Sequence, residues 1–255
     1  MATQVSDKVI TQKYKYVVLY LNGEYWGIYT IRERHSAEHY ASYRHVPADT
    51  VQIVRYMSYE KNNLAEMYEF LGANALNKEE NYAYVCSVLD VESFADWLIF
   101  ETYMDNIDIY GNIRYYYSPE EGLWTLGLAD VDLGMVGARA AFATADEAFH
   151  HGLLIGRLLD NESFQILMAQ RMAELFSGPM SDENMIALIR EMADQIRSET
   201  PNEQARWGTP TWGWESFVQE MVDFCDGRAK QMIDSFCIRV GFTKEEKERY
   251  FGNLG

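Results

Sequence analysis

The sequence predicts an α+β fold, in which strands are confined to the first half of the chain and helices dominate the second. Two observations carry this prediction. Runs rich in Val, Tyr and Ile alternate with turn residues up to residue 129, whereas apolar residues recur at helical spacing over most of the chain after residue 149. The 255 residues, of which 48% are hydrophobic, suffice for one large domain or two closely packed lobes.

The strands are expected to form two hairpins and one separate extended run. Asn22-Gly23, the strongest short hairpin signal, turns the first pair. The Ser-Pro-Glu-Glu-Gly segment at 118–122 turns the second. The predicted strands cover 14–21, 25–32, 50–57, 113–117 and 123–129.

The helices are predicted from apolar residues spaced three and four apart. Asp90 and Asp182 are suitable N-caps for two of them. The segment from Arg206 to Trp214 carries three tryptophans and is expected to interrupt the helical series with a turn, packed against the helical half or binding a sugar or peptide. The predicted helices cover 60–76, 90–104, 149–160, 162–176, 182–199, 214–239 and 243–251.

Composition excludes several classes of protein. The formal charge of −17 argues against a nucleic-acid binder, which needs clustered Lys and Arg, and suits a basic partner. No run approaches the roughly 20 apolar residues that span a bilayer. The cysteines, Cys86, Cys225 and Cys237, are odd in number and lack zinc-site spacing, so free thiols are expected.

Asp130 and Asp132 are the most informative pair of residues. They follow an apolar run, and two residues apart on an extended strand they would face the same side, with Cα atoms roughly 6.6 Å apart. A divalent cation would neutralise them, and magnesium usually takes one or two protein carboxylates together with phosphate oxygens. The alternative is a polar turn after the hairpin.

Other residues extend this candidate site. Asp108 and Asn112 supply a base and a further metal ligand, the set that phosphoryl transfer needs, although an Asx-type turn beside Gly111 is equally compatible. Trp124, six residues before Asp130, is expected on the same strand face, where it would either contact a nucleobase or pack in the core. Arg55 lies amid apolar neighbours and is expected to be buried. A buried cation needs an anionic partner, which would be either a phosphate or Glu33.

Three ordered motifs resemble the CotH family of spore-coat-type proteins. The first is Tyr20-Leu-Asn-Gly-Glu-Tyr-Trp-Gly-Ile-Tyr-Thr-Ile-Arg-Glu33, the second Asn106-Ile-Asp-Ile-Tyr-Gly-Asn112, and the third runs from Trp124 through Asp130-Val-Asp132. Their order and spacing match from about residue 14 to residue 240.

The resemblance implies an atypical protein-kinase-like fold with ATP and Mg between a small β-rich lobe and a larger, mainly helical lobe. We expect the first over residues 1–85, with one helix, and the second over 86–255. Asp108 resembles the catalytic aspartate. The other implied roles are metal binding by Asp130, Asp132 and Asn112, and nucleotide binding by Trp124 together with Tyr56 or its neighbour Arg55.

The resemblance also implies a protein substrate with Ser or Thr, often basic, and a spore-coat or cell-surface setting. Strands with Arg-Gly-x-Ser and Lys-rich segments, which family members place before the first hairpin, are not in this sequence. A truncated β-rich lobe with few phosphate-binding cations is therefore expected. The alternative function is a non-catalytic CotH-like binding, cell-surface or spore-coat module. A carbohydrate hydrolase would need a carboxylate pair flanking a sugar cleft.

Overall fold

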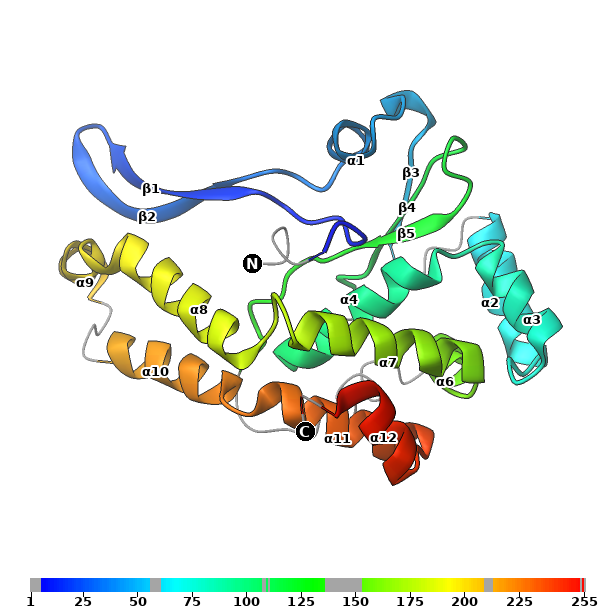
Figure 1. The fold of residues 1–255 in the computed structure, drawn as a ribbon. Helices are drawn as coiled ribbons and strands as arrows, with labels where there is room; N and C mark the ends of the chain where they lie inside the picture. Colours follow the sequence, from blue (N-terminus) through cyan, green and yellow to red (C-terminus); the bar gives the residue numbers. More distant parts are fainter. Residues whose placement is uncertain are drawn as a thin grey trace.

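The computed structural model describes residues 6–55, 61–106, 109, 111–135, 153–208, 213–252 and 254. It confirms the α+β class: strands lie along one side of the molecule and a larger body of helices along the other (Figure 1). None of the described helices is long and apolar enough to cross a membrane.

Both predicted hairpins are present. Strand β1 (Tyr14–Leu21) pairs antiparallel with β2 (Glu24–Arg32). The turn between them has positive φ at Asn22 (52°) and Gly23 (85°), as a two-residue hairpin turn with the right twist requires. In the second sheet β3 (Gln52–Arg55) pairs with β4 (Arg114–Tyr117), and β4 with β5 (Trp124–Gly127), all antiparallel.

The three-stranded sheet was only half predicted. Its β4–β5 hairpin is local in sequence, whereas β3 comes from before residue 85 and reaches β4 across about sixty residues of chain. The sheet therefore combines a strand from the predicted first lobe (residues 1–85) with two strands from the predicted second lobe (residues 86–255).

Every predicted helix is represented among the described residues, one of them by two helices, and the structure adds α1, α3 and α9. The described helices are α1 (Ala37–Arg44), α2 (Asn63–Ala73), α3 (Glu79–Cys86), α4 (Val91–Met104), α6 (Leu153–Leu159), α7 (Glu162–Phe176), α8 (Asp182–Arg197), α9 (Thr200–Trp207), α10 (Trp214–Cys225), α11 (Arg228–Val240) and α12 (Lys244–Phe251), with a 3-10 turn η2 at Ala48–Thr50.

Two local differences have clear causes. Helices α1, α3 and α9 were not predicted. Each is only eight residues long and buries at most three residues, so the apolar pattern over each is short. The helix predicted over 214–239 is two helices, since Gly227 adopts a left-handed conformation (φ 75°) and breaks the chain between α10 and α11.

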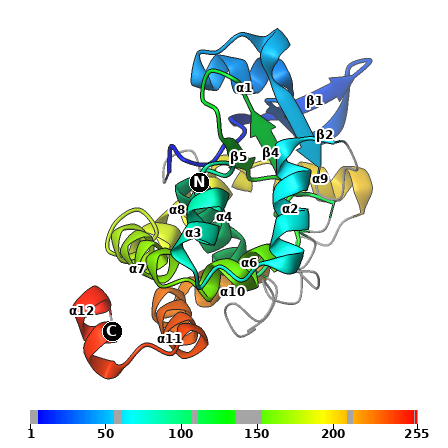
Figure 2. The same cartoon turned by 90° about the vertical axis from the view of Figure 1, so that its right-hand side faces the viewer.

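Helix α4 is the centre of the core. The side chain of Asp90 accepts hydrogen bonds from the backbone N–H groups of Glu92 and Ser93, which confirms the predicted N-cap. Every residue from Ser93 to Tyr103 is buried. Figure 2 shows α4 beneath the three-stranded sheet and α1 above it, so both faces of this sheet are covered.

The β1–β2 hairpin is joined to the helical body at α9. The indole N–H of Trp207 donates to the carbonyl oxygen of Trp26 (2.9 Å), and the guanidinium of Arg206 lies over both rings. A carboxylate oxygen of Glu203 accepts the N–H of Ile28 (2.9 Å). The predicted interruption at Arg206-Trp207 is thus the end of a helix that holds the hairpin; Trp212 lies outside the described residues.

Candidate functional site

The turn that carries Asp130 and Asp132 begins where β5 ends. The predicted strand over 123–129 stops at Gly127, although Leu128 still donates its N–H to the carbonyl of Ile10 (2.9 Å). Asp130 has a φ of 56°, so the chain reverses there and the two carboxylates do not alternate along an extended strand. The expectation that the two residues face the same side of an extended strand is therefore wrong, and they lie in a turn after the hairpin, as in the alternative.

Asp130 and Asp132 nevertheless line the same pocket, of about 490 Å³, and both side chains are exposed. Its walls come from three places: Tyr14, Tyr16 and Arg32 of the β1–β2 hairpin, the segment around Gln12, and α8. The hairpin, held at α9, thus forms part of the wall of the pocket that the carboxylates line.

A second pocket, of about 370 Å³, adjoins the first and is lined by four arginines. Arg32, Arg34, Arg55 and Arg114 line it together with Asp130, Glu33 and His35. Among the described residues, the first three of these arginines form no salt bridge. Arg114 donates to the carbonyl oxygens of Gly111 (2.6 Å) and Ile113 (3.1 Å).

The arginines raise the positive potential of this second pocket. Burial lowers the pKa of Arg114, and repulsion from Arg55 lowers it further, whereas Asp130 acts in the opposite direction. Burial, with smaller contributions from His39 and Arg114, lowers the pKa of His35 to about 4. His35 is therefore neutral at pH 7, and its Nδ1 hydrogen-bonds with the hydroxyl of Tyr116 (2.5 Å). Such a pocket attracts an anion with several charges.

Arg55 and Trp124 occupy opposite faces of the three-stranded sheet. Arg55 pairs with Arg114, which pairs with Gly127, and side chains directly opposite one another share a face. Trp124, three residues before Gly127, points to the other face. Arg55 is exposed, so the expectation that it is buried amid apolar neighbours is wrong.

Trp124 lies in the core. Its side chain has 0% exposed surface, its ring packs near that of Tyr117, and its Nε1 donates to the Oδ1 of Asn63 (2.8 Å). Trp124 and Asp130 do not line one pocket among those described, and the surroundings of the indole are those of the core-packing alternative.

Of the remaining predicted site residues, Asp108 and Tyr56 lie outside the described residues. Asn112 is partly buried in the turn between α4 and β4, where its N–H donates to the carbonyl of Ile109 (3.1 Å). Within the described part of the chain, no group of three or more His, Cys, Asp or Glu residues could hold a metal ion.

A buried network beneath the turn was missed by the sequence reasoning. The Nδ2 of Asn106 donates to the Oε2 of Glu101 (2.9 Å) and lies 3.4 Å from the carbonyl oxygen of Asp130. Burial raises the pKa of Glu101 to about 8, opposed by hydrogen bonds with Asn106 and Trp97. The available signal was Glu101, a charged residue that directly follows the apolar run from Trp97 to Phe100 in α4.

A comparison with known protein families gives a match that spans the three motifs. Residues 6–232 match the family model described as CotH kinase protein. That range contains the β1–β2 hairpin, α4, the Asp130 turn and the helices through α10, and it ends within the first part of α11. A comparison with curated proteins gave no match. The matched range covers most of the chain and confirms the resemblance seen in the sequence, so the chain belongs to the CotH kinase protein family.

Proposed function

We propose that this chain is an atypical protein kinase that transfers the γ-phosphate of ATP to Ser or Thr of a protein substrate in the presence of Mg. Membership in the CotH kinase family supports this activity. The observation that carries the proposal is the position of Asp130, which lines both the carboxylate pocket with Asp132 and the adjoining arginine pocket.

The carboxylate pair fits magnesium. Asp130 and Asp132 offer exposed carboxylate oxygens to one pocket, and Mg usually binds one or two carboxylates while keeping waters or phosphate oxygens as its other ligands. Asn112 is proposed as a further oxygen ligand, and Asp108 as the group that orients the substrate hydroxyl and accepts its proton. Mg would supply charge neutralisation between the phosphates.

The arginine pocket supplies a candidate partner for the phosphates. The sequence predicted few phosphate-binding cations around the candidate site. Arg32 and Arg34 from the end of β2, with Arg55 and Arg114 from the second sheet, are positioned to take that role. Guanidinium groups bind phosphate oxygens with two parallel hydrogen bonds.

Thermal melting with and without ATP and Mg tests nucleotide binding. Ligand at 100 times its Kd stabilises the folded state by about 2.7 kcal/mol, which raises Tm by about 5–10 °C for a chain of this size. Asp130→Asn is expected to abolish the shift. Asp49→Asn, at an exposed aspartate of η2 that lines neither pocket, is the matched control and is expected to keep it.

Transfer of radiolabelled phosphate to a casein-like substrate then tests catalysis. The wild type is expected to label the substrate and Asp130→Asn to lose the activity. The absence of any Tm shift at millimolar ATP-Mg would refute nucleotide binding. A shift without transfer would favour the non-catalytic binding module on the same fold.

A further inference from the structure

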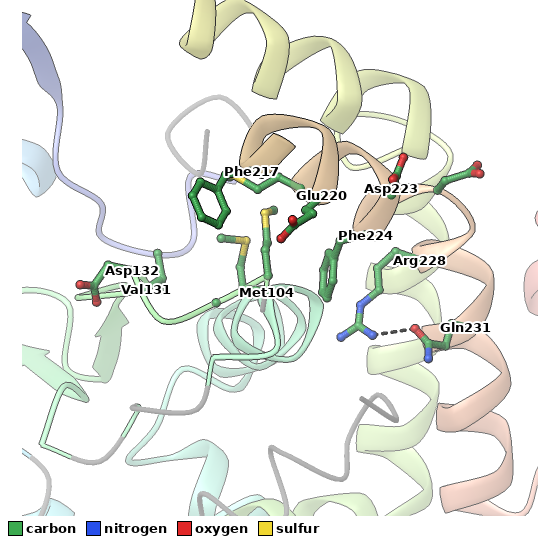
Figure 3. A pocket seen from close by; sticks show the side chains of 13 residues that line it. Met104, Val131, Asp132, Phe217, Glu220, Asp223, Phe224, Arg228 and Gln231 are labelled. Carbon is green, nitrogen blue, oxygen red and sulfur yellow. Dashed lines mark hydrogen bonds between the residues drawn. The ribbon is translucent and has the colours of Figure 1, made fainter. Parts of the chain in front are cut away.

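A third pocket is lined by Asp132 but by none of the four arginines of the second pocket. It has a volume of about 750 Å³ and is formed by the 131–135 turn, Met104 at the end of α4, and helices α10 and α11. Figure 3 shows Phe217, Glu220 and Phe224 of α10 directed toward Met104, with Asp132 at one end. We call this pocket the α10 groove.

The α10 groove has an exposed apolar surface. Phe217 is 63% exposed and Met221 37% exposed, and both line the groove together with Phe224 and Met104. Solvated apolar surface of this kind gains free energy when a partner covers it, and methionine adapts its shape to different side chains. The groove is suited to receive an apolar side chain.

The charges that line the α10 groove are mainly negative. Glu220, Asp223 and Asp226 line it, with Asp132 at the end toward the candidate magnesium site. Among the described residues, these four carboxylates form no salt bridge. A partner with positive charges would compensate them.

Among the described residues that line the groove, the single cation, Arg228, is held by other contacts. Arg228 is 1% exposed, and it donates to the carbonyl oxygens of Thr102 (2.7 Å) and Tyr103 (3.0 Å) and to Gln231 (2.7 Å). Its guanidinium lies over the ring of Phe224, 4.7 Å from the centroid. It caps the end of α4 and does not neutralise the carboxylates of α10.

We infer that the α10 groove binds an extended segment of the protein substrate, with an aliphatic or aromatic side chain between Phe217 and Met221 and with Lys or Arg beside Glu220, Asp223 and Asp226. This inference rests on the proposed kinase function, because Asp132 lines both the groove and the candidate magnesium pocket. A bound segment would thus run toward the site of transfer. A second copy of the chain is a poorer occupant, since each copy carries a net charge of −17.

Peptide binding in the absence of ATP tests the groove independently of catalysis. Three fluorescein-labelled peptides with a central Ser are compared. The first carries four Lys residues and one Leu, the second replaces this Leu by Ser, and the third replaces the four Lys residues by Glu. Fluorescence anisotropy is expected to show the tightest binding for the Lys-Leu peptide. Replacing Leu should weaken it about tenfold, the factor associated with one buried apolar side chain. Added salt should weaken it as well.

Two groove variants and two controls locate the binding site. Phe217→Ser and the double variant Glu220→Gln, Asp223→Asn are each expected to weaken binding of the Lys-Leu peptide at least tenfold. All three side chains are at the surface or rim, so Tm should not change. Ile238→Ser, at a residue of α11 that is 82% exposed and outside the groove, and Asp49→Asn are expected to bind like the wild type.

The outcomes separate this inference from the proposed function. If phosphate is transferred but Phe217→Ser leaves both peptide affinity and KM unchanged, the groove inference is wrong and the kinase proposal stands. If the peptide binds at the groove but ATP-Mg gives no Tm shift, the kinase proposal is refuted and the chain is a peptide-binding module. A wild-type dimer by light scattering that Phe217→Ser converts to a monomer would identify a second copy as the occupant and overturn the inference.

Discussion

Replacing Glu101 by glutamine tests the buried network beneath the Asp130 turn. Glu101 is 4% exposed and accepts a hydrogen bond from Asn106, whose Nδ2 also lies 3.4 Å from the carbonyl oxygen of Asp130. Glutamine has the same shape and keeps an oxygen that accepts this hydrogen bond, but it cannot ionise. The substitution therefore removes one titration with little change in packing.

The expected effect follows from the pKa. Burial raises the pKa of Glu101 from 4.5 to about 8, so between these pH values the folded state holds a proton that the unfolded chain releases. Because the folded state binds more protons there, the free energy of unfolding of the wild type falls as the pH rises through this window. At ~1.4 kcal/mol per pKa unit, the loss is about 3 kcal/mol at pH 7 and levels off above the folded-state pKa.

Urea unfolding at pH 5, 6, 7 and 8 measures this difference. Glu101→Gln is expected to match the wild type near pH 5 and to exceed it by about 3 kcal/mol at pH 7, a rise in Tm of about 6–12 °C. Glu66→Gln, at an exposed residue of α2, controls for the loss of one negative charge. Parallel pH profiles for Glu101→Gln and the wild type would mean that Glu101 is ionised in the folded protein, and the reasoning from burial would fail.

Two further substitutions test how the turn and α4 are held. In Gly134→Ala the new Cβ would lie 2.8 Å from the carbonyl oxygen of Met104, so the turn must shift. We expect a loss of about 1–3 kcal/mol in unfolding free energy and a smaller Tm shift with ATP-Mg. Gly72→Ala, where the new Cβ has nothing within 4 Å, is the control and should show neither effect. Arg171→Met leaves Asp96, 0% exposed, without the guanidinium that binds both its oxygens at 2.7 and 2.8 Å, and urea unfolding should show a loss of about 3–5 kcal/mol. An unchanged midpoint in either case would contradict the contact on which it depends.

Much of the local structure was predictable, because its causes lie within a few residues of chain. Asn22-Gly23 adopts positive φ at both positions and turns the first hairpin as expected. Asp90 caps α4, and α7 has the predicted bounds. The α+β class followed from the strand and helix patterns, and the family followed from three ordered motifs. Both kinds of signal lie in contiguous stretches of the sequence.

The helices that were missed show where local signals end. Helix α1 buries only His39, Tyr40 and Ala41, and its stability comes from the Ser36 cap and from the stacking of Tyr40 on Tyr116, a residue far along the chain (ring centroids 5.1 Å apart). Helix α9 buries no residue fully and is held through its contacts with the β1–β2 hairpin. Such elements depend on tertiary contacts, which periodicity does not reveal.

The sequence by itself determined which chemical groups the candidate site contains: two carboxylates two residues apart, at the end of an apolar strand and inside a family motif. Only the tertiary structure decided how they are presented. The left-handed conformation of Asp130 ends the strand, and pairing of β3 with β4 brings Arg55 to Arg114 beside it, while Trp124 turns into the core. The physical reason is that strand pairing and core packing are contacts between residues distant in the chain. Such contacts decide which charged side chains line the same pocket.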